Sequence, residues 1–184
     1  AVQLYQATLV SDDARYDQFM EGSLTLNPEE QRGLDIFMNE GRCIQCHGGS
    51  LLTNAAIDVV LGIDGVEEEG MIEAMPVATG AMTLYDTGFY NIAVRPTSED
   101  LGRGGTAPFV NPLTGERFPL SFTRLAWLKD AGRLPVWYRD LVPFPAAGIF
   151  QDAVDGAMKT PGLRNVELTG PYFRNGDSAT LMQV

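Results

Sequence analysis

Two cysteines and one histidine stand at positions 43, 46 and 47, and the chain has no other residue of either type. The spacing Cys-x-x-Cys-His is the attachment signature of a c-type haem. Two thiols one short turn apart can each add to a vinyl group of the same porphyrin, and the imidazole of the next residue can then bind the iron. We therefore predict one covalently attached haem c, held by Cys43 and Cys46 and ligated by His47.

Other uses of this motif fit less well. A structural zinc site usually takes four Cys or His ligands, whereas this chain offers three; zinc with a carboxylate as the fourth ligand stays open. A thioredoxin-like redox pair needs a strand before the motif and a helix after it. Here a predicted helix comes first, and the turn Gly48-Gly49-Ser50 follows. A plain disulfide would leave His47 without a role.

Bulk properties limit the classes of partner. The 184 residues suffice for one domain with a core, and 45% hydrophobic with 20% charged residues indicate a globular chain. The net charge of -11 argues against nucleic acid, whose phosphates would repel such a surface. It suits a basic electron-transfer partner, although solubility alone would explain it equally well.

The sequence predicts neither a membrane span nor a leader. No run approaches the roughly 20 apolar residues that a membrane helix needs. No basic-then-apolar segment follows Ala1, so we expect no signal peptide in this sequence. Covalent haem attachment takes place outside the cytoplasm, and we therefore expect a periplasmic or otherwise exported protein whose export signal was removed or lies upstream.

Local signals place the helices. Asn27 can cap a helix that starts at Pro28 and ends at Gly41, directly before the haem motif. A second helix is predicted over 121–131, with Ser121 as its cap.

Trp127 and Trp137 are interpreted as core aromatics, with electron relay as the alternative. Residues 67–69 are interpreted as a solvated loop. Asp177 or Ser178 can cap a new helix at Ala179, yet the sequence stops at Val184, so we expect a piece of a longer protein.

Three segments together resemble the bacterial di-haem cytochrome c peroxidase family, which includes the MauG-like enzymes. The first is residues 26–37, leading into 43–49. The second is 84–97, followed by 99–102. The third and most specific is 159–176, from Lys159-Thr160-Pro161-Gly162 to Arg174-Asn175-Gly176, followed by 179–181. Parts of the middle, about 67–81 and 111–157, lie outside the resemblance.

The resemblance implies a fold and a division into domains. Order and placement match the C-terminal haem lobe of that family. The expected fold is mainly α, a class I cytochrome c-like haem domain with a long loop-rich insertion, truncated at its last helix. Residues 1–23 would form the arm that connects two lobes, and 24–184 the haem domain, with the insertion at about 51–159.

Carried over position by position, the resemblance also assigns residues. His47 would be the proximal ligand, and Arg164 would pair with a haem propionate, which suits an always-charged fork; a surface salt bridge is the alternative. The backbone carbonyls of Thr169 and Pro171 match positions that bind calcium between the lobes. Arg174 stands where the family often has His. The sixth iron ligand is not assignable from the sequence, because the family's last-helix position lies beyond Val184 and Met182 comes too early in that pattern. Met71, Met75 and Met82 lie in the insertion and could reach the iron, but they are interpreted as buried residues that fill gaps in the core.

Three functions stay open, and only the resemblance to the family favours the first of them. The first is the electron-transfer lobe of a peroxidase, which passes electrons from a small redox protein to a second haem lobe that reduces hydrogen peroxide. This chain alone would not hold the peroxidatic site, and no catalytic residue can be named. The second is a stand-alone electron-carrier cytochrome c or haem subunit without catalysis. The third is a MauG-like oxidase of a protein side chain.

Overall fold

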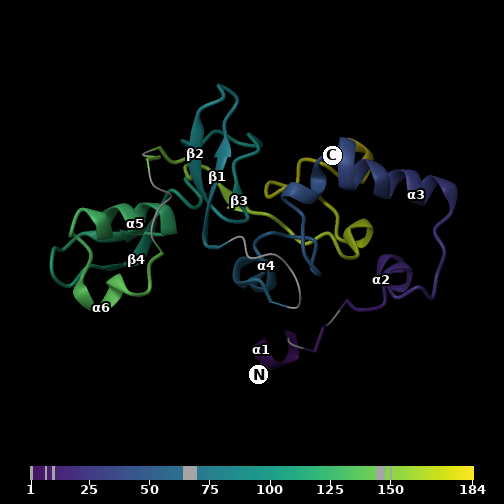
Figure 1. Ribbon diagram of the computed structural model, residues 1–184, viewed down its shortest axis with the longest axis horizontal. Helices are drawn as coiled ribbons and strands as arrows, with labels where there is room; N and C mark the ends of the chain where they lie inside the picture. The colour runs from purple at the N-terminus through teal and green to yellow at the C-terminus, as the bar shows by residue number, and fades with distance from the viewer. Residues whose placement is uncertain (1, 7, 10, 64–69, 144–147, 150) are drawn as a thin grey trace. The chain divides into compact units, whose positions relative to one another are not determined.

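The computed structural model describes residues 2–6, 8–9, 11–63, 70–143, 148–149 and 151–184 (Figure 1). The chain divides into two compact units, which we call the motif unit (residues 1–52 and 162–184) and the middle unit (53–161). The acidic run at 67–69 lies outside the described residues. Within the described part of the chain, no helix is both long and apolar enough to cross a membrane.

The helix predicted before the Cys-x-x-Cys-His motif is present in the motif unit. Asn27 Oδ1 accepts hydrogen bonds from the N–H groups of Glu29 and Glu30, both at 2.9 Å, and Glu30 accepts in return from the Asn27 N–H. This capping box starts helix α3, and a π-helical turn continues it to Gly41. The helices of residues 1–52 are α1 (Val2–Gln6), α2 (Arg15–Met20), α3 (Pro28–Asp35), the π-helix η1 (Ile36–Glu40) and the 3-10 helix η2 (Cys43–Gln45).

The C-terminal segment of the motif unit contains only short 3-10 turns, η3 (Val166–Leu168) and η4 (Leu181–Gln183). The prediction of an α-helix that begins at Ala179 is therefore wrong. Asp177 accepts from the Asn175 side chain, while the N–H of Thr180 donates to Gln183 Oε1 at 3.0 Å. These bonds close a 3-10 turn at Leu181–Gln183 in place of the first turn of an α-helix.

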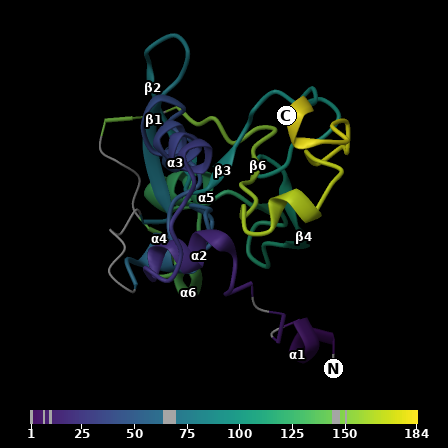
Figure 2. The ribbon, with the colours of Figure 1, turned by 90° about the vertical axis from the view of Figure 1, so that its right-hand side faces the viewer.

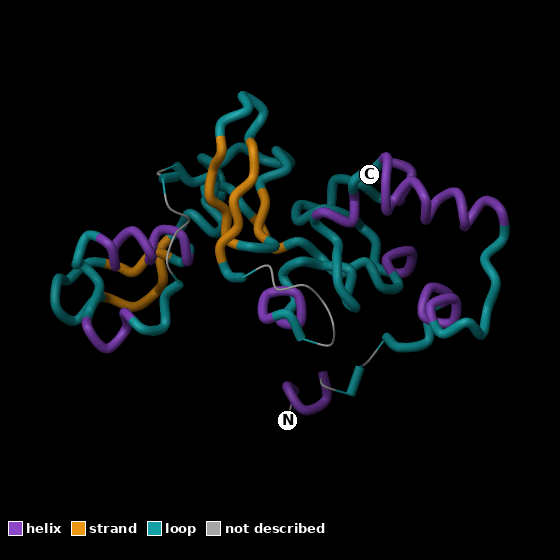
Figure 3. The backbone as a smooth tube through the Cα atoms, in the orientation of Figure 1, coloured by secondary structure: helices purple, strands orange, loops and turns teal. Residues whose placement is uncertain are grey.

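The middle unit overturns the expected fold class. Helices cover about 30% of the chain and strands about 16%, so the fold is not clearly mainly α, and much of it is loop. Three two-stranded antiparallel sheets form in the stretch expected to be loop-rich (Figure 3). They are β1–β2 (Ile72–Pro76 with Met82–Asp86), β3–β6 (Phe89–Tyr90 with Met158–Lys159) and β4–β5 (Thr106–Val110 with Arg117–Pro119). Short pairs like these lack the long alternating pattern that identifies strands in a sequence.

Strands β1 and β2 lie side by side in both ribbon views (Figures 1 and 2). They form an antiparallel pair in which Ile72 is opposite Asp86 and Pro76 is opposite Met82. After β2 the chain turns at Gly88, which has φ +76°. A Cβ atom there would lie 2.2 Å from the Ala55 backbone nitrogen, so only glycine fits this close approach.

Helices α4 (Ile57–Leu61), α5 (Phe122–Asp130) and α6 (Val136–Arg139) complete the middle unit. Ser121 caps α5, as predicted, by accepting from the Arg124 N–H. The core joins α5 to the β4–β5 sheet through Ala107, Phe118, Leu125, Ala126, Leu134 and Val142. Trp137 does not belong to it: the side chain is 62% exposed, so its assignment to the core is wrong.

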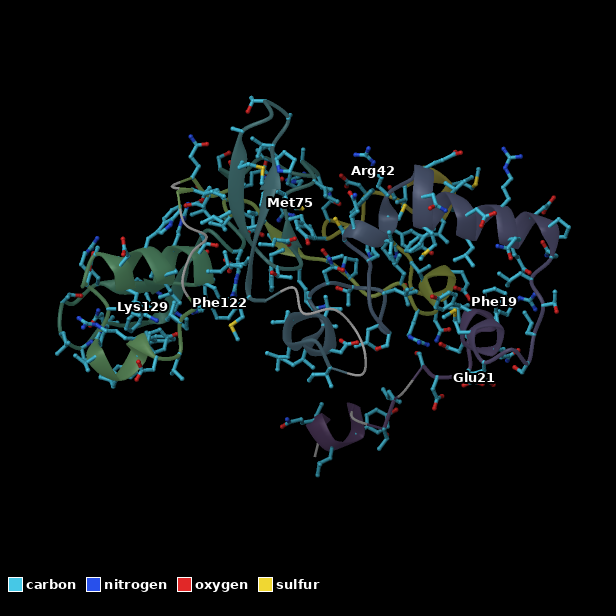
Figure 4. All side chains as sticks on the ribbon, in the orientation of Figure 1. Phe19, Glu21, Arg42, Met75, Phe122 and Lys129 are labelled. Carbon is cyan, nitrogen blue, oxygen red and sulfur yellow. The ribbon has the colours of Figure 1, made fainter. Side chains whose placement is uncertain are left out.

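The carboxylate of Asp86, at the end of β2, is fully buried and organises the start of α5. It accepts from Ser121 Oγ at 2.8 Å and from the N–H groups of Phe122 at 2.8 Å and Thr123 at 3.0 Å. Arg103 Nε donates to it at 2.5 Å. The Arg103 guanidinium also lies 4.7 Å from the ring centre of Phe122, which is labelled in Figure 4. A buried charge is tolerated here because it is paired and hydrogen-bonded.

Candidate functional site

The motif begins where the helix α3–η1 ends. Gly41 closes the π-helical turn by donating its N–H to Ile36 O at 2.7 Å. A Cβ atom on Gly41 would lie 2.9 Å from that oxygen and 3.2 Å from Cys43 Sγ, so a larger residue would crowd the first thiol. Arg42, labelled in Figure 4, then takes a left-handed conformation, φ +53°, at the N-cap position of η2, where its side chain forms no capping hydrogen bond. This reversal ends the helix and starts the turn that contains both cysteines.

Cys43 and Cys46 lie on a single 3-10 turn. The N–H groups of Cys46 and His47 both donate to Cys43 O, at 3.1 and 2.9 Å. Side chains three residues apart on such a turn eclipse one another, so the two thiols share one face. Both thiols are half-buried and neither forms a disulfide. A pair of reduced thiols on one face is what attachment of one planar group at two points requires.

The His47 ring is fixed by one hydrogen bond. Its Nδ1 atom lies 3.0 Å from the backbone carbonyl oxygen of Leu52. A carbonyl oxygen can only accept, so Nδ1 carries the proton and Nε2 presents its lone pair. Metal-ligating histidines use this arrangement, because a carbonyl partner fixes the tautomer and raises the basicity of the ligating nitrogen. The histidine is therefore prepared to bind a metal through Nε2.

Arg164 lies close to the motif, but its contacts are with protein. Its Nε donates to Ser50 O at 2.7 Å, and its Nη1 donates to Ser11 O at 2.8 Å and to the Asp17 carboxylate. As the donor in this last bond, the Arg164 guanidinium holds the pKa of the Asp17 carboxyl below its ordinary value, against the opposing effect of burial. The expected propionate contact stays a prediction beside these bonds.

The residues expected to bind calcium lie on an exposed turn. The Thr169 N–H donates to Val166 O at 3.2 Å, and beyond the Gly170–Pro171 bond the Tyr172 N–H donates to Ser178 O at 2.7 Å. Calcium binding by the Thr169 and Pro171 carbonyls stays a prediction. In the described ranges, no group of three or more His, Cys, Asp and Glu side chains is placed to hold a metal ion.

Apolar side chains of the motif unit are left without a core of their own. Every buried hydrophobic residue in the described part of the chain belongs to the middle unit. In the motif unit Ile36, Met38, Leu51 and Phe173 remain 37–51% exposed. A flat, largely apolar tetrapyrrole is a group that such side chains can cover, at about 25 cal/mol for each Å² removed from water. Two thiols, a prepared imidazole and unburied apolar side chains therefore fit a haem.

Two features of the site were missed by sequence reasoning. The carbonyl of Leu52 belongs to the backbone, so no residue type marks it. Asp17 stood in a segment interpreted only as a connecting arm, and no local pattern connects it to a residue 147 positions away. Of the methionines weighed as a sixth ligand, Met182 lies in the motif unit and is 95% exposed.

Comparison with known proteins gives relatives along the whole chain. Cytochrome-c peroxidase IdrP1 of Denitromonas iodatirespirans is 26% identical over 187 residues, which cover 100% of this chain and 38% of the relative. Cytochrome c551 peroxidase of Nitrosomonas europaea is 25% identical over 184 residues, 100% of this chain and 34% of the relative. Cytochrome c551 peroxidase of Pseudomonas aeruginosa is 38% identical over 50 residues, 27% of this chain and 14% of the relative.

The chain thus spans a little over a third of the length of the curated relatives that it matches throughout. No family model matches the sequence. No solved structure matches it significantly either.

Proposed function

The chain is related along its whole length to bacterial cytochrome c peroxidases, consistent with the di-haem peroxidase family, and on this premise we propose that it forms the haem c electron-transfer lobe of such an oxidoreductase. In this role the lobe accepts electrons from a small redox protein and passes them toward a second haem lobe, where hydrogen peroxide is reduced. A protein of this kind works in the periplasm, in keeping with attachment of haem c outside the cytoplasm.

The observation that supports the proposal best is the hydrogen bond from His47 Nδ1 to Leu52 O, beside two thiols that form no disulfide. Each residue has a separate part. Cys43 and Cys46 would hold the porphyrin through two thioether bonds, so that the group could not dissociate. His47 would bind the iron through Nε2, while the Leu52 carbonyl keeps the proton on Nδ1. A bound haem supplies reversible one-electron transfer at its iron, which needs no proton-transferring side chain in this lobe.

The acidic surface fits this role. With a net charge of -11, the chain attracts a basic donor protein over long distances, and that attraction weakens as salt is added. We propose one haem on this chain. As part of the same proposal, the backbone carbonyls of Thr169 and Pro171 would bind a calcium ion. Arg164 would contact a haem propionate.

The test uses the full-length protein, matured with the haem-attachment machinery. Mass spectrometry of the peptide that contains residues 43–47 should show one added haem. Exchange of His47 for Gln should leave the haem attached through its sulfurs but abolish oxidation of a reduced small cytochrome by hydrogen peroxide. The matched control is Gln45→Asn, a polar exchange inside the same motif.

Different results would favour the alternatives. An unmodified peptide would overturn the haem assignment itself. A haem-loaded protein that exchanges electrons with the donor but never consumes peroxide would be an electron carrier. Peroxide-dependent oxidation of a partner protein's side chain, without turnover of a reduced cytochrome, would identify a MauG-like oxidase.

A further inference from the structure

One guanidinium joins three segments of the motif unit. Arg164, before η3, donates from Nε to Ser50 O and from Nη1 to Ser11 O and to the Asp17 carboxylate. Its neighbour Asn165 adds a bond from Nδ2 to Ser11 Oγ at 2.9 Å. Residues at the start of the chain are thereby bound, through the C-terminal segment, to the loop that follows the Cys-x-x-Cys-His motif.

The loop after the motif contains Leu52, whose carbonyl oxygen accepts the hydrogen bond from His47 Nδ1. Ser50 lies in the turn that the Leu52 N–H closes onto Gly49 O at 3.2 Å. Leu52 itself has φ +53°, a conformation that a residue with a side chain takes only when its surroundings hold it there. A bond that restrains Ser50 O therefore restrains the turn, and with it the carbonyl oxygen 3.0 Å from His47 Nδ1.

The Asp17–Arg164 pair is well shielded from water. The side chains are 11% and 18% exposed, so solvent and salt screen this pair less than an ordinary surface ion pair. A planar guanidinium can donate hydrogen bonds to Ser50 O and to the Asp17 carboxylate at the same time, because its N–H donors form a rigid fork. A lysine ammonium, a single point on a flexible stem, cannot hold both partners in that geometry.

We propose that Asp17 is a positioning residue for His47: by orienting Arg164 it fixes the turn at 49–52, and the position of the N-terminal arm thereby tunes the iron-binding imidazole. The proposal rests on the proposed function, since it takes His47 to be an iron ligand. Loss of the pair weakens the bond to Leu52 O, makes Nε2 less basic, and so favours the ferrous over the ferric state.

The experiment measures the reduction potential of this haem in the full-length, haem-loaded protein. Asp17→Asn removes the charge but keeps an oxygen that can still accept from the Ala14 N–H, which donates to Asp17 at 2.9 Å in α2. Arg164→Lys keeps the charge and removes the fork. The controls are Asp12→Asn, with the same charge change on the same arm, and Arg32→Lys, the same exchange on exposed α3. Backbone amide exchange of residues 48–52 is followed in parallel.

Both test variants should raise the potential relative to wild type, and both should increase the exchange rate of the Leu52 N–H several-fold, while the two controls match wild type. A rise in Arg164→Lys excludes a change of net charge as the cause, and a rise in Asp17→Asn, which keeps Arg164 itself, separates the effect of the turn from a direct contact between Arg164 and a propionate. Faster exchange at an unaltered potential would overturn the proposal and leave a structural role only. Unaltered potential and exchange would overturn it as well. If the proposed function fails, the peptide with residues 43–47 has no haem, and amide exchange alone then tests the connection between arm and turn.

Discussion

His47 Nδ1 and the carbonyl oxygen of Leu52, five residues later, lie 3.0 Å apart. The bond decides which ring nitrogen carries the proton, and so which one is left to bind iron. It also makes the conformation of Leu52 part of the site, because φ +53° at Leu52 aims that carbonyl at the ring.

Leu52→Ile is expected to disturb the site without changing apolar volume. A β-branched side chain is disfavoured at positive φ, and we expect a loss of about 1–2 kcal/mol in unfolding free energy. The haem potential should rise with it, as the carbonyl leaves Nδ1. Leu52→Asn is the matched variant, because asparagine tolerates the left-handed region. Urea unfolding and potentiometry measure the two effects. Equal potentials in the Ile and Asn variants would contradict the assignment.

The motif shows what the sequence could predict. The cap at Asn27 is confirmed, and it could be predicted because side-chain capping is local. Cys43, Cys46 and His47 form a predicted haem site because their residue types are rare and closely spaced, and that assignment stays a prediction. The carbonyl of Leu52 and the carboxylate of Asp17 act through backbone geometry and through a contact between distant segments, so no local pattern reveals them. The mainly α fold was wrong for the same reason: Ile72 pairs with Asp86 and Phe89 with Lys159 in strands too short to be recognised.

Gly33→Ala should stabilise the chain. Gly33 lies inside α3, and nothing approaches within 4 Å of the Cβ atom that alanine would add. Alanine reduces the conformational freedom of the unfolded chain, so unfolding free energy should rise by roughly 0.5–1 kcal/mol. Thermal unfolding of both proteins measures this. A lower melting temperature would mean that another surface packs against Gly33 in the full-length protein.

Asn27→Ala, which removes the cap of the same helix, should lower the unfolding free energy by about 1 kcal/mol.

Asp86→Asn should destabilise the middle unit strongly. The amide keeps one oxygen and turns its NH2 group either toward Arg103 Nε and the Phe122 N–H or toward Ser121 Oγ and the Thr123 N–H, so buried N–H donors lose their acceptor in either orientation. Breaking a buried ion pair from one side costs about 3–5 kcal/mol. Glu99→Gln is the matched control, because Glu99 forms an exposed pair with Arg95 four residues away, and its loss should stay within about 0.5 kcal/mol. Urea unfolding monitored by tryptophan fluorescence compares the two, and losses of equal size would contradict the role given to Asp86.

Stability of the motif unit should fall in acid through Asp17. Its folded pKa lies below the ordinary 3.8 because Arg164 donates a hydrogen bond to the ionised form. As the pH falls, the unfolded chain therefore takes up this proton first, and the unfolded state is favoured. The contribution of Asp17 is complete well above pH 3.8 and is lost as the pH drops through the lower folded pKa. Asp17→Asn should accordingly reduce stability at pH 7 and approach wild type near pH 2, as measured by urea unfolding at both pH values. Asp12→Asn controls for the change in net charge. A difference between wild type and Asp17→Asn that is as large at pH 2 as at pH 7 would show that the carboxylate charge is not what binds Arg164.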